Sequence, residues 1–262
     1  MAAFRGFLIA FLAVSPAALA APDAKTPAAP AVRVEAGDPS VEGSFLHPYT
    51  NRWRFFMQKK GGEPVEAGVW SDALEATSYA GRPALKRTQV AEYKKGIRLT
   101  FVNVFDPKTM APFTADYERS DTGETRHVEF REGEVSFRRL PGTGDNARQQ
   151  YVASLDHRVL DFYDGMYGVL LDAFPLSEGF AATFPAFDSD TASVDWIAIR
   201  VTGRETVAAG AGRRADTWVV HAETKKYGQS TWWVTREAPY VIKAELILSE
   251  EAGGAKVTYE MI

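Results

Sequence analysis

The sequence predicts a mainly β protein, built as a strongly curved antiparallel sheet or half-barrel with one central amphipathic helix. From Val41 onward, apolar and polar residues alternate with a period of two in many successive segments. Residues 155–173 instead repeat apolar residues at steps of three and four, which indicates a helix. The connections between the alternating segments are short, and this favours pairing of strands that are neighbours in the chain.

The composition is that of an ordinary globular protein and excludes several classes of function. The 262 residues are 45% hydrophobic and 24% charged, with a formal net charge of −4. Cysteine is absent, which excludes a disulfide scaffold, a zinc–thiolate site and a cysteine nucleophile. Nucleic-acid binding is not expected, because the chain is acidic and has no basic stripe.

The first 20 residues have the pattern of a cleavable secretory signal. Arg5 supplies the positive charge, residues 7–14 form an apolar run, and Ala18-Leu19-Ala20 gives the small-x-small cleavage pattern. The apolar run is about half of the ~20 residues that a membrane-spanning helix needs. We therefore expect cleavage after Ala20, export to the periplasm and no membrane span.

The mature chain is expected to hold one domain. Residues 21–40 contain four prolines among alanines, which predicts a linker because proline interrupts both helices and sheet ladders. No internal repeat is visible after this segment. We expect residues 41–262 to form a single β-rich domain, as all-β chains of this length commonly do.

Strands in the first half of the domain are indicated by apolar side chains at alternate positions. The alternating apolar residues are Trp53, Phe55 and Met57 in one segment and Ile97, Leu99 and Phe101 in another. A hairpin is predicted where Val128 and Phe130 precede the tight turn Glu132-Gly133, and Val135 and Phe137 follow it.

The second half is predicted to contain strands at residues 195–201, 217–220, 230–235, 240–248 and 256–261. The last two place their apolar residues on one face, which indicates a sheet with one packed and one solvated face. The turn between them is expected at Gly253-Gly254. Trp232 and Trp233 are adjacent and therefore point to opposite faces of their strand, so that strand needs two apolar environments.

The helical stretch is expected to lie across the concave face of the sheet. Its periodic apolar residues are Val159, Leu160, Tyr163, Met166, Tyr167, Leu170 and Phe174. Ser154 is the expected N-cap and Pro175 the stop. Gly165 and Gly168 weaken a helix, and glycine inside a helix often allows another backbone or ring to come close.

Motifs for common catalytic chemistries are absent from the sequence. There is no G-x-S-x-G nucleophile elbow, no phosphate-binding loop, no H-E-x-x-H and no strand–glycine–helix unit for a dinucleotide. The four histidines, His47, His127, His157 and His221, do not have metal-ligand spacing. We expect no cofactor and no metal, and a non-catalytic protein is favoured over an enzyme.

Two alternatives remain open. Asp161 and Asp164 are one helical turn apart, and His157 is next to Asp156, so a hydrolase acting on envelope polymers is one alternative. The run of residues 188–191 is interpreted as a turn, because it has too few oxygen ligands for calcium. The other alternative is a structural partner of an envelope complex, bound through a strand edge or the 21–40 arm.

Aromatic residues are the strongest remaining signal. Phe, Tyr and Trp total 32, and all six tryptophans fall in or beside predicted strands. A bank of rings on a curved sheet suits an apolar small molecule or lipid. We expect a module that binds an apolar or envelope-derived ligand in the concavity, lined by Trp53, Phe55, Phe101, Tyr163, Tyr167 and Trp232.

Three motif groups resemble the domain-of-unknown-function 3108 family of exported bacterial proteins. They are residues 174–179 with 184–188, residues 201–207 with Gly212 and 218–220, and residues 231–234 with 239–243. The resemblance covers about residues 155–262. It departs at Gly210, where a proline is usual, and at Arg213-Arg214, where an apolar residue is usual. The resemblance implies a bent sheet with a helix inside, similar to periplasmic lipoprotein carriers. The family has no established activity, so the resemblance assigns no catalytic residues.

Overall fold

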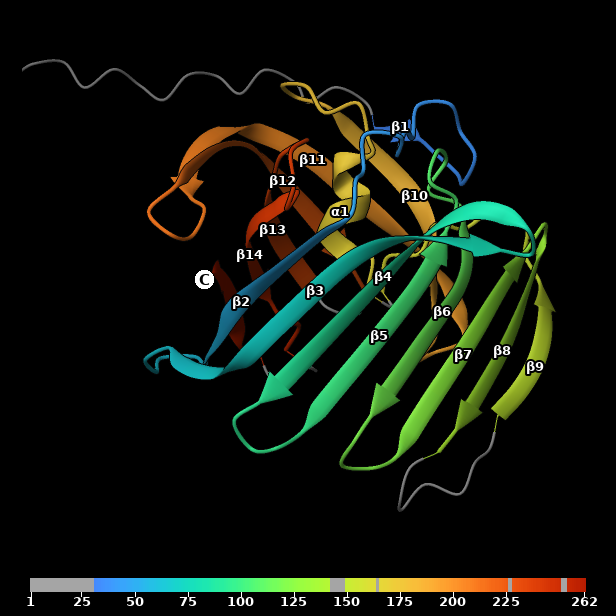
Figure 1. Cartoon of the computed structure of the whole chain (residues 1–262), viewed down its shortest axis with the longest axis horizontal. Coiled ribbons are helices and arrows are strands. Elements are labelled where there is room, and N and C mark those ends of the chain that lie inside the picture. Colours follow the sequence, from blue (N-terminus) through green and yellow to red (C-terminus); the bar gives the residue numbers. More distant parts are fainter. Residues whose placement is uncertain (1–30, 142–148, 164, 226–227, 251–253) are drawn as a thin grey trace, which may run out of the picture.

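A computed structural model describes residues 31–141, 149–163, 165–225, 228–250 and 254–262. The predicted signal, the first ten residues of the predicted linker, Asp164 and Gly253 lie outside this part of the chain. The described residues form one curved 15-stranded sheet and one short helix (Figure 1). The prediction of a mainly β protein with a curved antiparallel sheet is therefore confirmed.

The elements follow one another in this order: β1 (Val32–Arg33), β2 (Tyr49–Gln58), β3 (Val65–Tyr79), β4 (Arg82–Tyr93), β5 (Arg98–Phe105), β6 (Pro112–Arg119), β7 (Glu124–Arg131), β8 (Glu134–Leu140), β9 (Gln149–Ser154), α1 (Tyr167–Asp172), β10 (Ala181–Asp188), β11 (Ser193–Ala208), β12 (Arg214–Thr224), β13 (Gly228–Val234), β14 (Val241–Ile247) and β15 (Lys256–Met261).

The sheet consists of two antiparallel meanders joined through their outer strands. Strands β2 to β9 pair in chain order, as do β10 to β15. The last strand, β15, then returns to pair with β2, from Lys256 opposite Gln58 to Met261 opposite Trp53. Among the strands of the described residues, β1 alone pairs in parallel, with β10. The sheet curls so that β10, near one end, packs against β6–β8, near the other end. The helix α1 lies on the inner side of this curl (Figure 1).

The predicted strand details agree with the structure. The Glu132-Gly133 turn joins β7 to β8, with Arg131 paired to Glu134, and Gly133 has a φ of +68° that suits glycine. Trp232 packs in the main core, whereas Trp233 packs on the other face with Val207 and Ile242. The two apolar environments required by the Trp232-Trp233 pair are therefore both present.

The predicted helix is wrong over the described residues before Tyr167. Only Tyr167–Asp172 is helical, and Leu160 forms a parallel bridge with Ala186 of β10. Arg87 Nη1 donates to the carbonyl oxygens of Gly165 (2.7 Å) and Met166 (3.1 Å), and Gly165 has a φ of +115°. Arg87 thus binds the Gly165 carbonyl just before α1, and it shares the Met166 carbonyl with the Leu170 N–H, which donates to it at 3.1 Å. The apolar period before Tyr167 reflects a bent segment facing the concave sheet.

Part of the segment assigned to the linker packs on the domain. Val34 and Ala36 are buried, and the Val34 N–H donates to the carbonyl oxygen of Thr183 at 2.9 Å. Glu35 contacts the His157 ring, with Oε1 2.9 Å from Nδ1. Residues 32–36 therefore extend the domain boundary upstream of Val41.

The interior holds a main core and a separate second cluster. The main core lies on the concave side around α1. The second cluster lies between β6–β8 and β10, and consists of Ala115, Val128, Phe130, Val135, Phe137, Val159 and Phe187. In the part of the chain that the structure describes, every helix is too short to cross a bilayer.

Candidate functional site

A cavity of about 290 Å³ lies inside the curved sheet, next to the segment that carries α1. At ~30 Å³ for each molecule in liquid water, this is room for roughly ten waters. All six residues expected from the sequence line it: Trp53, Phe55, Phe101, Tyr163, Tyr167 and Trp232. The structure therefore brings together side chains from three strands, β2, β5 and β13, and from the central segment.

The register of the sheet places these rings on one face. Trp53 of β2 lies opposite Trp70 of β3, and Phe55 lies opposite Tyr259 of β15. The cavity side of β2–β5 and β13–β15, called the apolar wall here, consists of Trp53, Phe55, Met57, Trp70, Tyr93, Leu99, Phe101, Trp232, Val241, Ala244, Leu246, Leu248, Val257 and Tyr259. Trp70 stacks on Phe101 with centroids 5.8 Å apart.

Several members of the apolar wall were missed from the sequence. Trp70, Tyr93 and Tyr259 are contributed by β3, β4 and β15, next to strands whose rings were recognised. Whether each of these side chains points into the concavity depends on the residue with which it pairs across the sheet. The alternation of residues 257, 259 and 261 was visible, but only the β15–β2 pairing assigns that face to the concavity.

One end of the cavity is fixed by a buried ion pair. Arg87 Nη2 lies 2.7 Å from Asp72 Oδ2, and Tyr49 also donates to Asp72 at 2.7 Å. Burial alone would lower the pKa of Arg87, but the Asp72 carboxylate and the Tyr49 hydroxyl raise it above its usual value. The charged guanidinium therefore holds the Gly165 and Met166 carbonyls against β4.

Two tryptophans of the apolar wall differ in their hydrogen bonding. When the Gln89 amide is oriented to suit its neighbours, its oxygen accepts from Trp70 Nε1 at 3.1 Å and from Arg87 Nη2 at 3.0 Å. Trp53 Nε1 is buried and has no acceptor among the described residues. Trp70 is thus tied to the polar network at the end of the cavity, whereas Trp53 packs through its ring alone.

The helix sits on the sheet through Gly168. A Cβ atom at this position would lie 2.7 Å from Val241 Cγ2 and 2.8 Å from Trp232 Cε3. Tyr167, the neighbouring residue, stacks on Trp232 with centroids 5.9 Å apart. The expectation that glycine here allows a ring to come close is confirmed.

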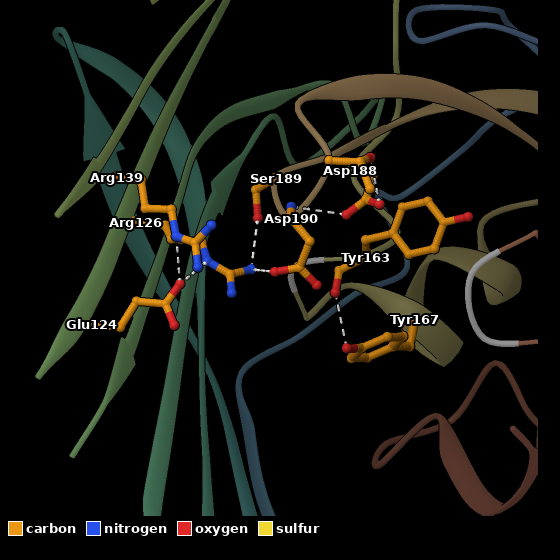
Figure 2. Close-up of polar contacts among 9 residues, drawn as sticks. Glu124, Arg126, Arg139, Tyr163, Tyr167, Asp188, Ser189 and Asp190 are labelled. Carbon is orange, nitrogen blue, oxygen red and sulfur yellow. Dashed lines mark hydrogen bonds and ion pairs between the residues drawn. The ribbon is translucent and has the colours of Figure 1, made fainter. Parts of the chain in front are cut away.

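A polar wall, defined as Tyr117, Arg126 and Asp190, lines another side of the cavity. Arg126 projects from β7 toward the turn between β10 and β11, where it forms an ion pair with Asp190 (Figure 2). Its Nε donates to Glu124 Oε1 at 2.8 Å, and Arg139 Nε donates to the same oxygen at 2.8 Å. The cavity therefore has two chemically different sides.

Tyr163 is fixed by its own hydrogen bonds beside the polar wall. Its hydroxyl donates to Asp195 Oδ2 at 2.5 Å, and its carbonyl accepts from the Tyr167 hydroxyl at 2.9 Å. Burial raises the pKa of Tyr163, and the hydrogen bond to the Asp195 carboxylate raises it further. Tyr163 consequently remains a neutral donor rather than a proton acceptor near neutral pH.

The groups considered for a hydrolase do not meet in this cavity. His157 contacts Glu35 and packs its ring on Trp196, while Asp161 accepts from Asn103 Nδ2 at 2.6 Å. Neither residue lines the cavity, and Asp164 lies outside the described residues. Within the described ranges, no three His, Asp or Glu side chains gather as a metal site would require.

Comparison with known proteins gives a family and a fold. The model of the family of proteins of unknown function DUF3108 matches residues 50–251, which extends the resemblance well upstream of residue 155. A solved β-barrel-like protein of domain of unknown function DUF1849 from Brucella abortus is similar, with a TM-score of 0.51 and 8% identity. The similarity covers 83% of this chain and 96% of that chain. No curated protein matches the sequence.

Proposed function

The chain belongs to the DUF3108 family of proteins of unknown function, and we propose that it is a non-catalytic periplasmic module that binds an apolar or envelope-derived ligand. The observation that supports this is the aromatic cavity on the concave face. Ligand-binding pockets in proteins are concave and lined mainly by hydrophobic and aromatic side chains, with a few polar groups. A space for roughly ten waters, lined mainly by rings and aliphatic side chains, suits an apolar occupant.

The exposure of the apolar wall supports entry of a ligand from outside. Trp53 and Phe55 are buried, whereas Met57 further along the same strand is 38% exposed. Leu99 and Leu246 are half-buried. Apolar side chains thus continue from the interior toward the solvent, and covering them would contribute about 25 cal/mol for each Å² removed from water.

The periplasmic location is proposed from the sequence of residues 1–20. A protein expressed with its complete N-terminus should be recovered from the periplasmic fraction with Ala21 as its first residue. Intact mass and N-terminal sequencing of the fractionated protein test this. Recovery only in the cytoplasmic fraction with residues 1–20 still present would contradict the proposed location.

Ligand binding is tested by the fluorescence of N-phenyl-1-naphthylamine, which increases in apolar surroundings. The wild-type protein should bind it in a saturable way. Leu246→Trp adds volume at the apolar wall and should weaken binding by at least about 10-fold, because the added ring occupies the cavity.

The adjacent residue gives the matched control. Ile247 is 53% exposed and is absent from the cavity lining, so Ile247→Trp should leave the affinity within about twofold. Equal effects of the two substitutions, or no saturable binding by the wild type, would contradict the proposal.

A structural partner role is supported by one separate observation. Strand β9 is an edge of the sheet, and its Val152 is 61% exposed. Exposed edge strands can pair with an extended segment of another protein. Val152→Lys should reduce pull-down of such a partner without changing N-phenyl-1-naphthylamine binding. Retained pull-down would remove this alternative.

A further inference from the structure

The two walls of the cavity suit different parts of one ligand. The apolar wall presents rings and aliphatic side chains from β2–β5 and β13–β15, and the polar wall presents Arg126 and Asp190. An entirely apolar molecule would remove the polar wall from water without replacing its hydrogen bonds, which costs free energy. The geometry therefore favours an amphiphile over a plain hydrocarbon.

Arg126 is held rigidly but keeps donors available. Its guanidinium packs over the Tyr117 ring at 4.5 Å from the centroid, and its side chain is 12% exposed. Nε donates to Glu124, and Nη1 contacts Asp190 and Ser189 (Figure 2). Nη2 has no hydrogen-bond partner among the described residues, although a guanidinium carries five N–H donors.

Among the described residues, carboxylates outnumber guanidinium groups beside Arg126. Arg126 and Arg139 carry two positive charges, and Glu124 and Asp190 carry two negative charges. A third carboxylate, that of Asp188, accepts from the Asp190 N–H at 3.0 Å. An anionic head group would meet these carboxylates at short range, whereas an uncharged oxygen can accept a hydrogen bond without that repulsion.

We propose that the ligand is an amphiphile whose uncharged oxygen-bearing group, such as an acyl ester or alcohol, accepts a hydrogen bond from Arg126 while its chain covers the apolar wall. This proposal depends on the proposed ligand-binding function and specifies the chemical class of the ligand. It concerns binding alone, with no bond made or broken.

The first test uses the wild-type protein and two competitors with the same chain length. Bound N-phenyl-1-naphthylamine is displaced at pH 8 with 1-monododecanoylglycerol or sodium dodecanoate, both below their aggregation concentrations. The uncharged ester should displace the probe at about 3- to 10-fold lower concentration, because its oxygen accepts the hydrogen bond from Arg126 without repulsion from the carboxylates of Glu124, Asp188 and Asp190. Equal or stronger displacement by dodecanoate would overturn the proposal.

The second test compares two arginines that donate to the same Glu124 oxygen. Arg126→Met should weaken displacement by the ester about 3- to 10-fold, with the probe affinity within about twofold. Arg139→Met should change neither, because Arg139 does not line the cavity. An unchanged ester affinity in folded Arg126→Met would overturn the proposal. If this variant does not fold, the wild-type ranking of ester and acid still decides.

The two proposals fail in distinguishable ways. If the wild-type protein does not bind N-phenyl-1-naphthylamine at all, the proposed function fails. If it binds the probe but dodecanoate competes as well as the ester, ligand binding stands and the uncharged head group is excluded.

Discussion

The cavity and the second cluster are both built from inward-pointing rings, but the rings of the second cluster meet rings from across the sheet, whereas those of the apolar wall border an open space. In the second cluster, Phe187 of β10 lies between Phe130 and Phe137, with ring centroids 6.3 and 6.2 Å away. At the cavity, the apolar wall faces the short helix instead of another strand, and the helix contacts Trp232 and Val241 closely through Gly168. The same residue types therefore give a packed core or a hollow depending on what lies opposite them.

The largest predicted difference concerns one phenylalanine from each region. Phe137→Ala should destabilise the fold by about 3–5 kcal/mol, because Phe137 is fully buried and its removal leaves a void. Phe101→Ala, at the cavity, should cost about 1–3 kcal/mol less, because part of its surface already faces open space. Urea unfolding measures both. Equal losses would show that the cavity is as tightly packed as the second cluster.

A methyl group added to α1, where the helix contacts the sheet, tests the side of the cavity opposite the apolar wall. Gly168→Ala should destabilise by about 1–3 kcal/mol and weaken probe binding, because the new Cβ displaces Trp232 or Val241. Gly62→Ala is the control, since its nearest neighbour, the Lys59 carbonyl oxygen, would lie 3.4 Å away. Denaturation midpoints of the two variants give the comparison, and a stabilised Gly168→Ala would contradict the described contact.

Much of this comparison could be predicted from local sequence. Period-two alternation identified the strands, and the six expected residues do line one cavity. The helix was overextended because an apolar repeat of three and four cannot distinguish a helix from a bent segment whose carbonyls Arg87 binds. That interaction joins residues 78 positions apart and has no local signature.

The polar wall could not be predicted from the sequence either, because it also depends on contacts between residues far apart in the chain. Arg126 lies two residues before the predicted hairpin, and the turn interpreted at residues 188–191 lies at residues 189–192, directly after β10. Nothing local indicated that Arg126 and this turn face each other. Their contact depends on the curl of the whole sheet, which brings β7 to the β10–β11 turn. Neighbouring residues in the chain indicate which segments form strands, but they do not indicate which ends of the sheet come together.

Asp172, at the end of α1, gives the region beside the cavity a pH dependence. Burial raises the pKa of Asp172 well above its usual value, with partial opposition from Arg236 and Arg87, and neither carboxyl oxygen has a hydrogen-bond partner among the described residues. The folded state then binds more protons than the unfolded state above the ordinary aspartate pKa. Its contribution to stability is therefore lost as the pH rises from about 4 through the folded pKa.

Asp172→Asn should flatten the fall in unfolding free energy between pH 4 and pH 7 relative to the wild type. Asp156→Asn, at an exposed position, is the matched control and should leave the pH dependence as it is. Urea unfolding at pH 4, 5.5 and 7 measures both variants. Unchanged pH dependence in Asp172→Asn would show that another group controls it.

The smallest predicted effect separates the two tryptophans that face each other across β2 and β3. Trp70→Phe breaks the hydrogen bond to Gln89, whereas Trp53→Phe breaks none that the described residues make. Trp70→Phe should therefore cost about 0.5–1.5 kcal/mol more than Trp53→Phe. Thermal or urea unfolding decides, and the reverse order would contradict the assigned Gln89 contacts.

The central claim, that the hollow region holds an apolar ligand, is tested most directly by native mass spectrometry of protein purified without detergent or lipid extraction. The wild type should carry an additional mass that denaturation releases into an organic solvent, and Leu246→Trp should carry less of it than Ile247→Trp. The claim would be contradicted if the wild-type protein were observed only at its polypeptide mass and did not increase the fluorescence of N-phenyl-1-naphthylamine in solution.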